Sequence, residues 1–351
     1  MQNKTNAFQV NRERSTSKRR ESKLVPNSKD IYLHNEPVNI IDGSPLLYIH
    51  GGNLFYERSI KGHMETILTD TNTHRYVGIL DGRGNFRKEI AQKAKYKGNR
   101  DEAKKKIQET FPYLEDVREH LIEKYKFIVV HGIEADDLAG ILNRRLNPNK
   151  VMHILLPSVD ANGEMEDYGT QVVRARVRTY KSVISSIDKD LKTLDSYFYD
   201  LKTHIMEAID YDKSFIMLNK KRNKLIGCGY KFKYAQILMG DPVDNIKGLH
   251  KCGAVGAYKI LADCFTEEDC IRACKAAFYK KQVALIKEAM QTRAAELIAK
   301  GIKPNLKMPS YDVIQEASDA VYEENYNLIT ILERNKTVGD IKIQRYPQRL
   351  F

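Results

Sequence analysis

The sequence contains no apolar run close to the roughly 20 residues that a membrane-spanning helix needs. Its N-terminus also lacks the apolar core of a secretory signal. From these two absences we expect a soluble protein of the cytoplasm that has no membrane partner.

Cysteine is scarce, and the five cysteines form no Cys-x-x-Cys pair. An odd number of scattered thiols argues against a disulfide framework and against a zinc site. No Ser-His-Asp or Cys-His arrangement is visible among the nine scattered histidines. The sequence therefore predicts reduced, mostly buried thiols and gives no sign of a covalent nucleophile.

The positive charge is concentrated in two stretches of the chain. The formal net charge is +12, and residues 1–30 hold eight Lys/Arg against three Asp/Glu, while residues 87–106 hold nine against three. A localised basic surface is typical of proteins that bind phosphates. A solvated tail and a solvated helix face explain the charge about equally well.

Composition and apolar periodicity predict three regions. Residues 1–35 are polar and lack periodic apolar positions, which predicts a disordered basic arm. In residues 36–234 short apolar runs alternate with helical patterns, which predicts an α/β domain with a mainly parallel central sheet flanked by helices. Residues 235–351 predict a helical region in which a Gly-punctuated turn precedes several amphipathic helices.

Acidic residues recur in five short blocks, most of them at the end of an apolar run. The carboxyl ends of parallel strands meet at one crevice, so these side chains are expected to converge. A single Asp after a strand is more often a helix cap than a ligand, but five such blocks in one chain are not easily explained as caps. Oxygen ligands suit Mg²⁺ and Mn²⁺. The predicted ligands are Asp42, Asp81, Glu134, Asp136, Asp137, Asp188, Asp190, Asp241 and Asp244.

A pair of divalent ions about 4 Å apart can clamp the attacking and leaving oxygens of phosphodiester hydrolysis. An anionic substrate must then be drawn toward an anionic pocket, so basic residues are needed nearby. The stretch that follows Asp81 provides them, including Lys93, Lys95 and Lys104.

A glycine-rich segment, NIKGLHKCGAVG, lies between two expected helices. Such a turn can present backbone N–H groups to a phosphate with no side chain in the way, which favours a DNA backbone as ligand. The alternative is an ordinary helix hairpin whose glycines are C-caps. The residues assigned to this contact are Gly248, Lys251, Gly253 and Gly256.

Taken in order, the acidic blocks resemble the motifs of the flap endonuclease family, which includes phage 5′-exonucleases and the 5′-nuclease domain of bacterial DNA polymerase I. The matching segments are IIDGSPLLY, GILDGRGNFRKEI with YKGNRDE, GIEADDLAG, ISSIDKDLKTL, ILMGDPVDNIKG and YEENYNLITIL. The resemblance spans about residues 38–332. It implies a PIN-like 5′-nuclease fold with a helical arch at about residues 91–126 and a C-terminal helix-hairpin-helix element.

The resemblance also implies roles for individual residues and cofactors. Matched by motif position, Asp42 and Asp81 serve both catalysis and the first metal region, and Lys97 and Arg100 steer the scissile phosphate. Tyr96 stacks on a terminal base. Two or more Mg²⁺ ions are implied, with Mn²⁺ as a substitute, and the family often binds K⁺ at the helix-hairpin-helix turn.

This chain departs from the family pattern in three places. Lys251 stands where the family usually has a glycine, residues 147–181 look like an insertion, and the basic arm is extra. We predict a monomeric, Mg²⁺-dependent 5′-3′ exonuclease or flap endonuclease that acts on branched or 5′-ended DNA in replication or repair, in a bacterial or phage-infected cell. RNA-primed ends remain an open substrate, and a metal-dependent ribonuclease and a non-catalytic branched-DNA-binding protein are the alternatives.

Overall fold

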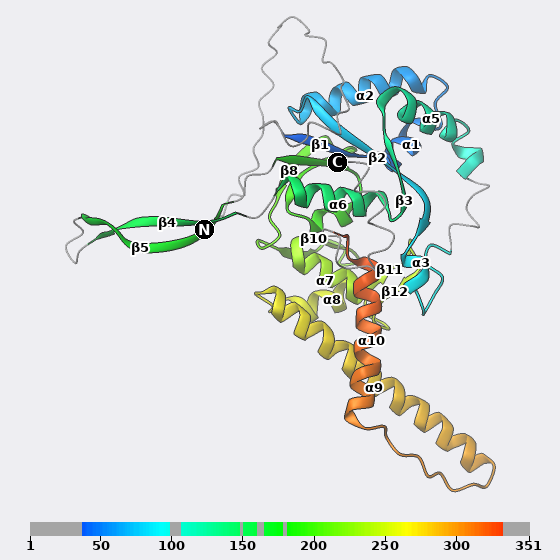
Figure 1. The fold of residues 1–351 in the computed structure, drawn as a ribbon. Coiled ribbons are helices and arrows are strands. Elements are labelled where there is room, and N and C mark those ends of the chain that lie inside the picture. The colour runs from blue at the N-terminus through cyan, green and yellow to red at the C-terminus, as the bar shows by residue number, and fades with distance from the viewer. Residues whose placement is uncertain (1–36, 99–106, 148–149, 160–164, 178–180, 333–351) are drawn as a thin grey trace, which may run out of the picture.

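A computed structural model describes residues 37–98, 107–147, 150–159, 165–177 and 181–332 (Figure 1). The predicted arm at residues 1–35, Arg100 and Lys104 lie outside these residues. None of the described helices is long and apolar enough to cross a membrane.

The central element is a six-stranded sheet with the strand order β3-β2-β1-β6-β7-β8. All neighbouring pairs are parallel except the last, in which β8 runs antiparallel to β7. The mainly parallel sheet predicted from the sequence is thus confirmed. Its strands are β1 (Val38–Asp42), β2 (Arg75–Asn85), β3 (Ile128–Gly132), β6 (Ser182–Ser186), β7 (Ser196–Asp200) and β8 (Ile205–Ile209).

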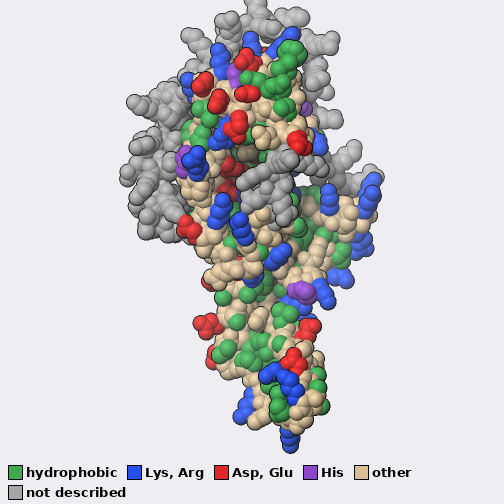
Figure 2. All heavy atoms as spheres, turned by 90° about the vertical axis from the view of Figure 1, so that its right-hand side faces the viewer, with side chains coloured by type: hydrophobic (Ala, Val, Ile, Leu, Met, Phe, Trp, Pro, Cys, Tyr) green, Lys and Arg blue, Asp and Glu red, His purple; other side chains and the backbone are tan. Residues whose placement is uncertain are grey.

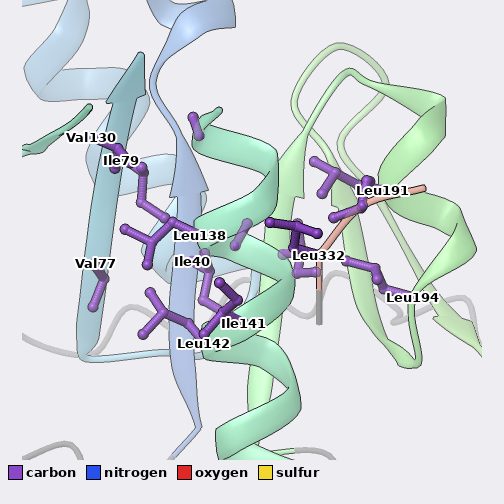
Figure 3. Close-up of a cluster of buried hydrophobic side chains, with 14 of the residues drawn as sticks. Ile40, Val77, Ile79, Val130, Leu138, Ile141, Leu142, Leu191, Leu194 and Leu332 are labelled. Carbon is purple, nitrogen blue, oxygen red and sulfur yellow. The ribbon is translucent and has the colours of Figure 1, made fainter. Parts of the chain in front are cut away.

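Helices cover both faces of this sheet, which explains why β1 is apolar on both sides and buried at all five positions. On one face, Ile40 and Ile79 pack against Leu138 and Ile141 of α6 (Figure 3). On the other, Ile41 and its neighbours pack against three helices. The covering helices are α6 (Ala135–Leu146) on the first face and α1 (Ser44–His50), α2 (Tyr56–Asp70) and α5 (Leu114–Tyr125) on the second.

The helices from α7 onward form the C-terminal part, and the last two project from the body as a long helical hairpin (Figure 1). Several helices were expected after Thr266, but residues 267–299 form one continuous helix, α9. No glycine or proline interrupts it, and a capping box of Thr266 and Asp269 starts it. This part contains α7 (Gly229–Met239), β11 (Gly240–Asp241), β12 (Ile246–Lys247), α8 (Ala254–Leu261), α9 (Glu267–Ala299) and α10 (Tyr311–Ile329).

Three element boundaries are irregular. A break at Gly51–Gly52 separates α1 from α2. Strand β2 continues through Asp81–Gly82 to Asn85 and pairs again with Gly132 beyond an irregularity. Only a short 3₁₀ helix, η1 (Lys189–Thr193), follows β6. Smaller elements are α3 (Arg87–Ile90) and the β9 (Phe215–Leu218) and β10 (Leu225–Cys228) pair.

The predicted insertion at residues 147–181 forms an antiparallel hairpin of β4 (Lys150–Val159) and β5 (Met165–Val177). It projects from the sheet domain (Figure 1), and among the described strands β4 and β5 pair only with each other. Its two ends meet in the domain, where Lys181 N–H donates to the Asn147 side chain.

Removing this hairpin is therefore expected to leave the sheet domain folded. A chain in which a short Gly-Ser turn joins Asn147 to Lys181 should unfold within about 3 °C of the wild-type temperature. A change of this size is typical of substitutions that break no packed contact. Thermal unfolding followed by circular dichroism would measure it. Loss of the cooperative transition would show that the hairpin is part of the core.

A buried histidine makes the stability of the sheet domain depend on pH. His50, at the end of α1, is 3% exposed, and its ring hydrogen-bonds to Ser59 and His63, each at 3.0 Å. Burial lowers the pKa of His50 to about 4, from 6.5 in the unfolded chain. The unfolded chain therefore takes up this proton first, so stability present above pH 6.5 is lost as pH falls toward 4.

We expect this loss to be on the order of 3 kcal/mol for His50, since one pKa unit corresponds to about 1.4 kcal/mol. Urea unfolding at pH 7 and pH 4.5 should show a smaller loss in His50→Gln than in the wild type. The exposed His74 offers the control, and His74→Gln should keep the wild-type pH dependence. An identical pH dependence in both variants and the wild type would contradict this assignment.

Candidate metal centre

The parallel sheet brings the first four acidic blocks to one edge. Asp42 is the last residue of β1, Asp81 lies in the adjacent β2, and Asp188 follows β6 as the N-cap of η1. Glu134 is the N-cap of α6, directly after β3. Because these strands are parallel, their carboxyl ends lie side by side, as the sequence predicted.

A cavity of about 210 Å³ lies at this edge. Figure 2 shows acidic side chains recessed in a hollow of the molecule, with Lys and Arg side chains around it. Asp42 and Asp81 are not among the residues that line the cavity. Its predicted site residues are Tyr96, Lys97, Glu134, Asp136, Asp188, Asp190, Asp241 and Asp244.

Burial, together with mutual repulsion, raises the pKa of several of these carboxylates. Asp42 is 7% exposed, and burial raises its pKa to about 7, although hydrogen bonds from Ser186 Oγ (2.7 Å) and Ser44 N (3.0 Å) oppose the shift. Burial raises the pKa of Asp188 to about 6, and the charge of Asp190 adds to this. Burial also raises the pKa of Asp136, and Asp42 and Asp188 raise it further. The site thus concentrates negative charge that solvent does not screen.

This donor set fits hard divalent cations. Among the described residues, no three Asp, Glu, His or Cys side chains are already arranged to coordinate one metal ion. The Asp136 carboxylate nevertheless faces the cavity, and within the described part of the chain it makes no hydrogen bond or ion pair. An oxygen-only set of crowded carboxylates is the kind of site that binds Mg²⁺ or Mn²⁺, and a cation among them would offset the repulsion.

The second acidic group comes from η1 and from the turn after α7. Asp190 Oδ1 accepts hydrogen bonds from Lys189 Nζ at 2.8 Å and from the side chain of Gln236. Asp241 Oδ1 accepts one from Val243 N–H at 2.7 Å. These contacts fix the carboxylates at the cavity wall.

Two neighbouring residues connect the two groups. The Tyr96 hydroxyl lies 3.0 Å from both Glu134 Oε2 and Asp244 Oδ2. The Lys97 ammonium pairs with Glu134 and lies 3.8 Å from Asp244 Oδ2. Lys97 also has a φ of 54°, a left-handed conformation that is uncommon for a lysine, and its N–H donates to Asp244 O at 2.8 Å. The loop that carries both residues is therefore docked on the turn between β11 and β12.

Three predicted roles do not fit this geometry. Asp137 is fully buried and its two oxygens bind the Arg87 guanidinium at 2.5 and 2.8 Å, so we do not retain it as a metal ligand. Tyr96 is 3% exposed, which leaves its ring no free face for a DNA base. The Lys93 ammonium is held on α10 by Asn325 Oδ1 at 3.0 Å, although Lys93, like Lys95, is an exposed residue.

The glycine turn lies between α7 and α8, as predicted. A Cβ on Gly248 would lie 2.2 Å from the Met239 carbonyl carbon, so this glycine is required by close backbone packing. Gly253 is the N-cap of α8, and a Cβ there would meet nothing within 4 Å. Gly256 lies in the first turn of α8, and Lys251 adopts a φ of 62° in the turn. Gly253 thus leaves the N-terminus of α8 open to a ligand, whereas a Cβ on Gly256 would lie 3.1 Å from Cys252 Sγ.

Arg87 is the residue at this site that the sequence analysis missed. It is 2% exposed and lines the cavity. In the sequence it stands among the lysines and arginines of residues 87–106, for which a phosphate-binding surface and a solvated helix face were about equally expected, and nothing local distinguishes it from them. Only the approach of residues 328–332, more than 200 positions away, buries it.

Comparison with known proteins gives matches for this fold. Residues 58–195 match the model of the 5′-3′ exonuclease N-terminal resolvase-like domain. A bacteriophage T5 flap endonuclease, solved as a pseudo-enzyme–product complex with DNA and metal ions, superimposes with a TM-score of 0.54 at 18% identity, covering 90% of this chain and 98% of that one. T5 5′-exonuclease with bound zinc gives a TM-score of 0.53 at the same identity and coverage. No curated protein matches the sequence significantly.

Proposed function

We propose that the chain is a member of the flap endonuclease and 5′-3′ exonuclease family, whose N-terminal resolvase-like domain its residues 58–195 match, and that it is a divalent-metal-dependent nuclease that hydrolyses DNA at 5′ ends and 5′ flaps. The observation that supports this most strongly is that acidic residues following β3, β6 and α7 line one cavity, with Asp42 and Asp81 in the neighbouring strands β1 and β2. A non-catalytic DNA-binding protein has no need of this concentration of buried charge.

We assign the metal ligands to eight of the nine predicted carboxylates. Asp42, Asp81, Glu134 and Asp136 form the first group, and Asp188, Asp190, Asp241 and Asp244 form the second, in which some ligands act through water. When bound, Mg²⁺ or Mn²⁺ would activate water and offset the charge that develops on the phosphorus-bound oxygens. The hydrogen bonds that Ser186 donates to Asp42 and Gln236 donates to Asp190 hold these two carboxylates in place.

Lys97 has the position and charge to act on the substrate. Its ammonium lies in the cavity within reach of both acidic groups, so a phosphate that enters the cavity meets a positive charge there. An ammonium close to the scissile phosphate stabilises the transition state more than the ground state as negative charge builds up. We assign no role to Arg100, which lies outside the described residues.

Duplex DNA is proposed to lie across the α7–α8 turn. The first N–H groups of α8 are open at Gly253, and backbone N–H groups at a helix N-terminus bind phosphate without reading sequence. The T5 flap endonuclease was solved with DNA and metal ions, which supports the same substrate class here. A free 5′ end at the cavity and a duplex on the turn would together select for branched or 5′-ended DNA.

The test is cleavage of three 5′-labelled DNAs, a flap duplex, a blunt duplex and a single strand, each with Mg²⁺ and with EDTA. We expect metal-dependent cutting of the flap substrate near its junction. Cleavage of RNA in preference to all three would indicate a ribonuclease. Tight flap binding without cutting in Mg²⁺ or Mn²⁺ would reduce the protein to a DNA-binding module.

A further inference from the structure

Every hydrogen of the Arg87 guanidinium has an acceptor nearby in the protein interior. Its Nη1 and Nη2 bind the two oxygens of Asp137 at 2.5 and 2.8 Å. Its Nε donates to Leu328 O and its Nη2 to Thr330 O, each at 2.9 Å. Glu134 Oε2 lies 3.4 Å from Nη1. A bidentate, fully satisfied arginine of this kind fixes its partners far more rigidly than a lysine would.

Asp137 ties the same segments together from the other side. Its Oδ2 accepts the N–H of Glu134 at 3.1 Å, and its Oδ1 accepts the N–H of Leu332 at 3.1 Å. The Arg87–Asp137 pair thus holds the start of α6 and the chain after α10 in one buried unit. Figure 3 shows Leu332 packed close to α6 within this hydrophobic core.

The distances separate the two acidic partners of Arg87. Asp137 takes the two short contacts, and Glu134 is left at the margin, at 3.4 Å from Nη1. The Glu134 carboxylate therefore keeps its contacts toward the cavity, with Lys97 and Tyr96. Without Asp137, the buried guanidinium would be left with Glu134 as its nearest carboxylate.

We propose that Arg87 is a positioning residue, which acts through Asp137 and the backbone of residues 328–332 to hold Glu134 in the orientation that binds a divalent cation. This inference rests on the proposed function of the acidic cavity. It adds a residue to that site and gives the segment after α10 a role in it, since Leu328, Ile329 and Ile331 also line the cavity.

The first test measures Mn²⁺ affinity by calorimetry, together with thermal unfolding and flap cleavage, in Arg87→Lys and Arg87→Met. We expect both variants to bind Mn²⁺ about 10- to 100-fold more weakly, as when the outer partner of a metal ligand is removed. The kcat should fall while KM for DNA stays near the wild-type value, and lysine should not rescue. The matched control is Arg75→Met, at the start of β2, the strand that precedes α3, and it should keep wild-type Mn²⁺ affinity.

Asp137→Asn provides a second variant that preserves side-chain volume. It should weaken Mn²⁺ binding as well, because the Arg87 guanidinium would then pair with the Glu134 carboxylate and compete with the cation for it. Folded variants at Arg87 and Asp137 with wild-type Mn²⁺ affinity would overturn the inference, as would a failure of all of them to fold, which would leave these residues a purely structural role. A wild-type protein that neither binds Mn²⁺ nor cleaves DNA would instead refute the proposed function.

Discussion

Asp188→Asn is expected to lower the rate of flap cleavage about a thousandfold or more while duplex binding changes little. Losing a metal-binding charge costs several kcal/mol of transition-state stabilisation, and each 1.4 kcal/mol corresponds to a factor of about ten in rate. The fold should survive, because an asparagine oxygen can still accept the Asp190 N–H that Asp188 Oδ1 accepts at 2.8 Å. Single-turnover cleavage and fluorescence anisotropy in Ca²⁺ would measure the two quantities.

The same variant should not lose thermal stability. Burial and the charge of Asp190 raise the pKa of Asp188 to about 6, so removing the negative charge relieves an unfavourable interaction. Asp312→Asn, in the exposed first turn of α10, is the matched control and should cleave normally. Equal loss of binding and cleavage in Asp188→Asn would argue against a metal role for this carboxylate.

Gly248→Ala is expected to destabilise the C-terminal part by about 3 kcal/mol, the upper range for overpacking a tight site. The added methyl would lie 2.2 Å from the Met239 carbonyl carbon and 2.4 Å from Gly240 N, and neither backbone atom can move without breaking the α7–β11 connection. Leu249 N–H, which donates to Leu238 O at 2.7 Å in this turn, would be displaced too. Urea unfolding would measure the loss, and an unchanged midpoint would contradict the packing described for this turn.

Gly253→Ala in the same turn should affect DNA binding more than stability. Its φ of −94° suits any residue, and a Cβ would meet nothing within 4 Å, so the loss of stability should not exceed the roughly 1 kcal/mol of an N-cap change. The methyl would stand where the duplex backbone is proposed to approach α8. We expect the Kd for duplex DNA to rise about tenfold, which is 1.4 kcal/mol. Normal duplex affinity in this folded variant would place the duplex elsewhere.

The parallel sheet and its acidic edge were predictable because each depends on local patterns. A short apolar run that ends in Asp-Gly, as at Asp42, marks a buried strand and its exit. Parallel pairing then brings such exits together whatever the helices between them do. The carboxylates that follow β1, β3 and β6 or lie in β2 fit this pattern, whereas Asp241 and Asp244 follow a helix and were identified from the recurrence of acidic blocks and the family resemblance.

Long-range contacts explain what the sequence did not reveal. Glu134, Asp136 and Asp137 stand within four residues, and helix geometry alone does not say which of them faces the cavity. Asp137 turns inward because Arg87 and Leu332 N–H meet it there. Lys93 was predicted to contact DNA, but α10 captures its ammonium. Each of these outcomes depends on segments distant in sequence, which no local pattern encodes.

The two acidic groups are proposed to form one divalent-cation centre. Crystals soaked in Mn²⁺ and measured at the manganese absorption edge would show whether a cation binds there. We predict anomalous peaks in the cavity, bounded by Asp136 and Glu134 on one side and by Asp188, Asp190 and Asp241 on the other. Well-ordered crystals with no anomalous peak in this cavity at saturating Mn²⁺ would contradict the claim.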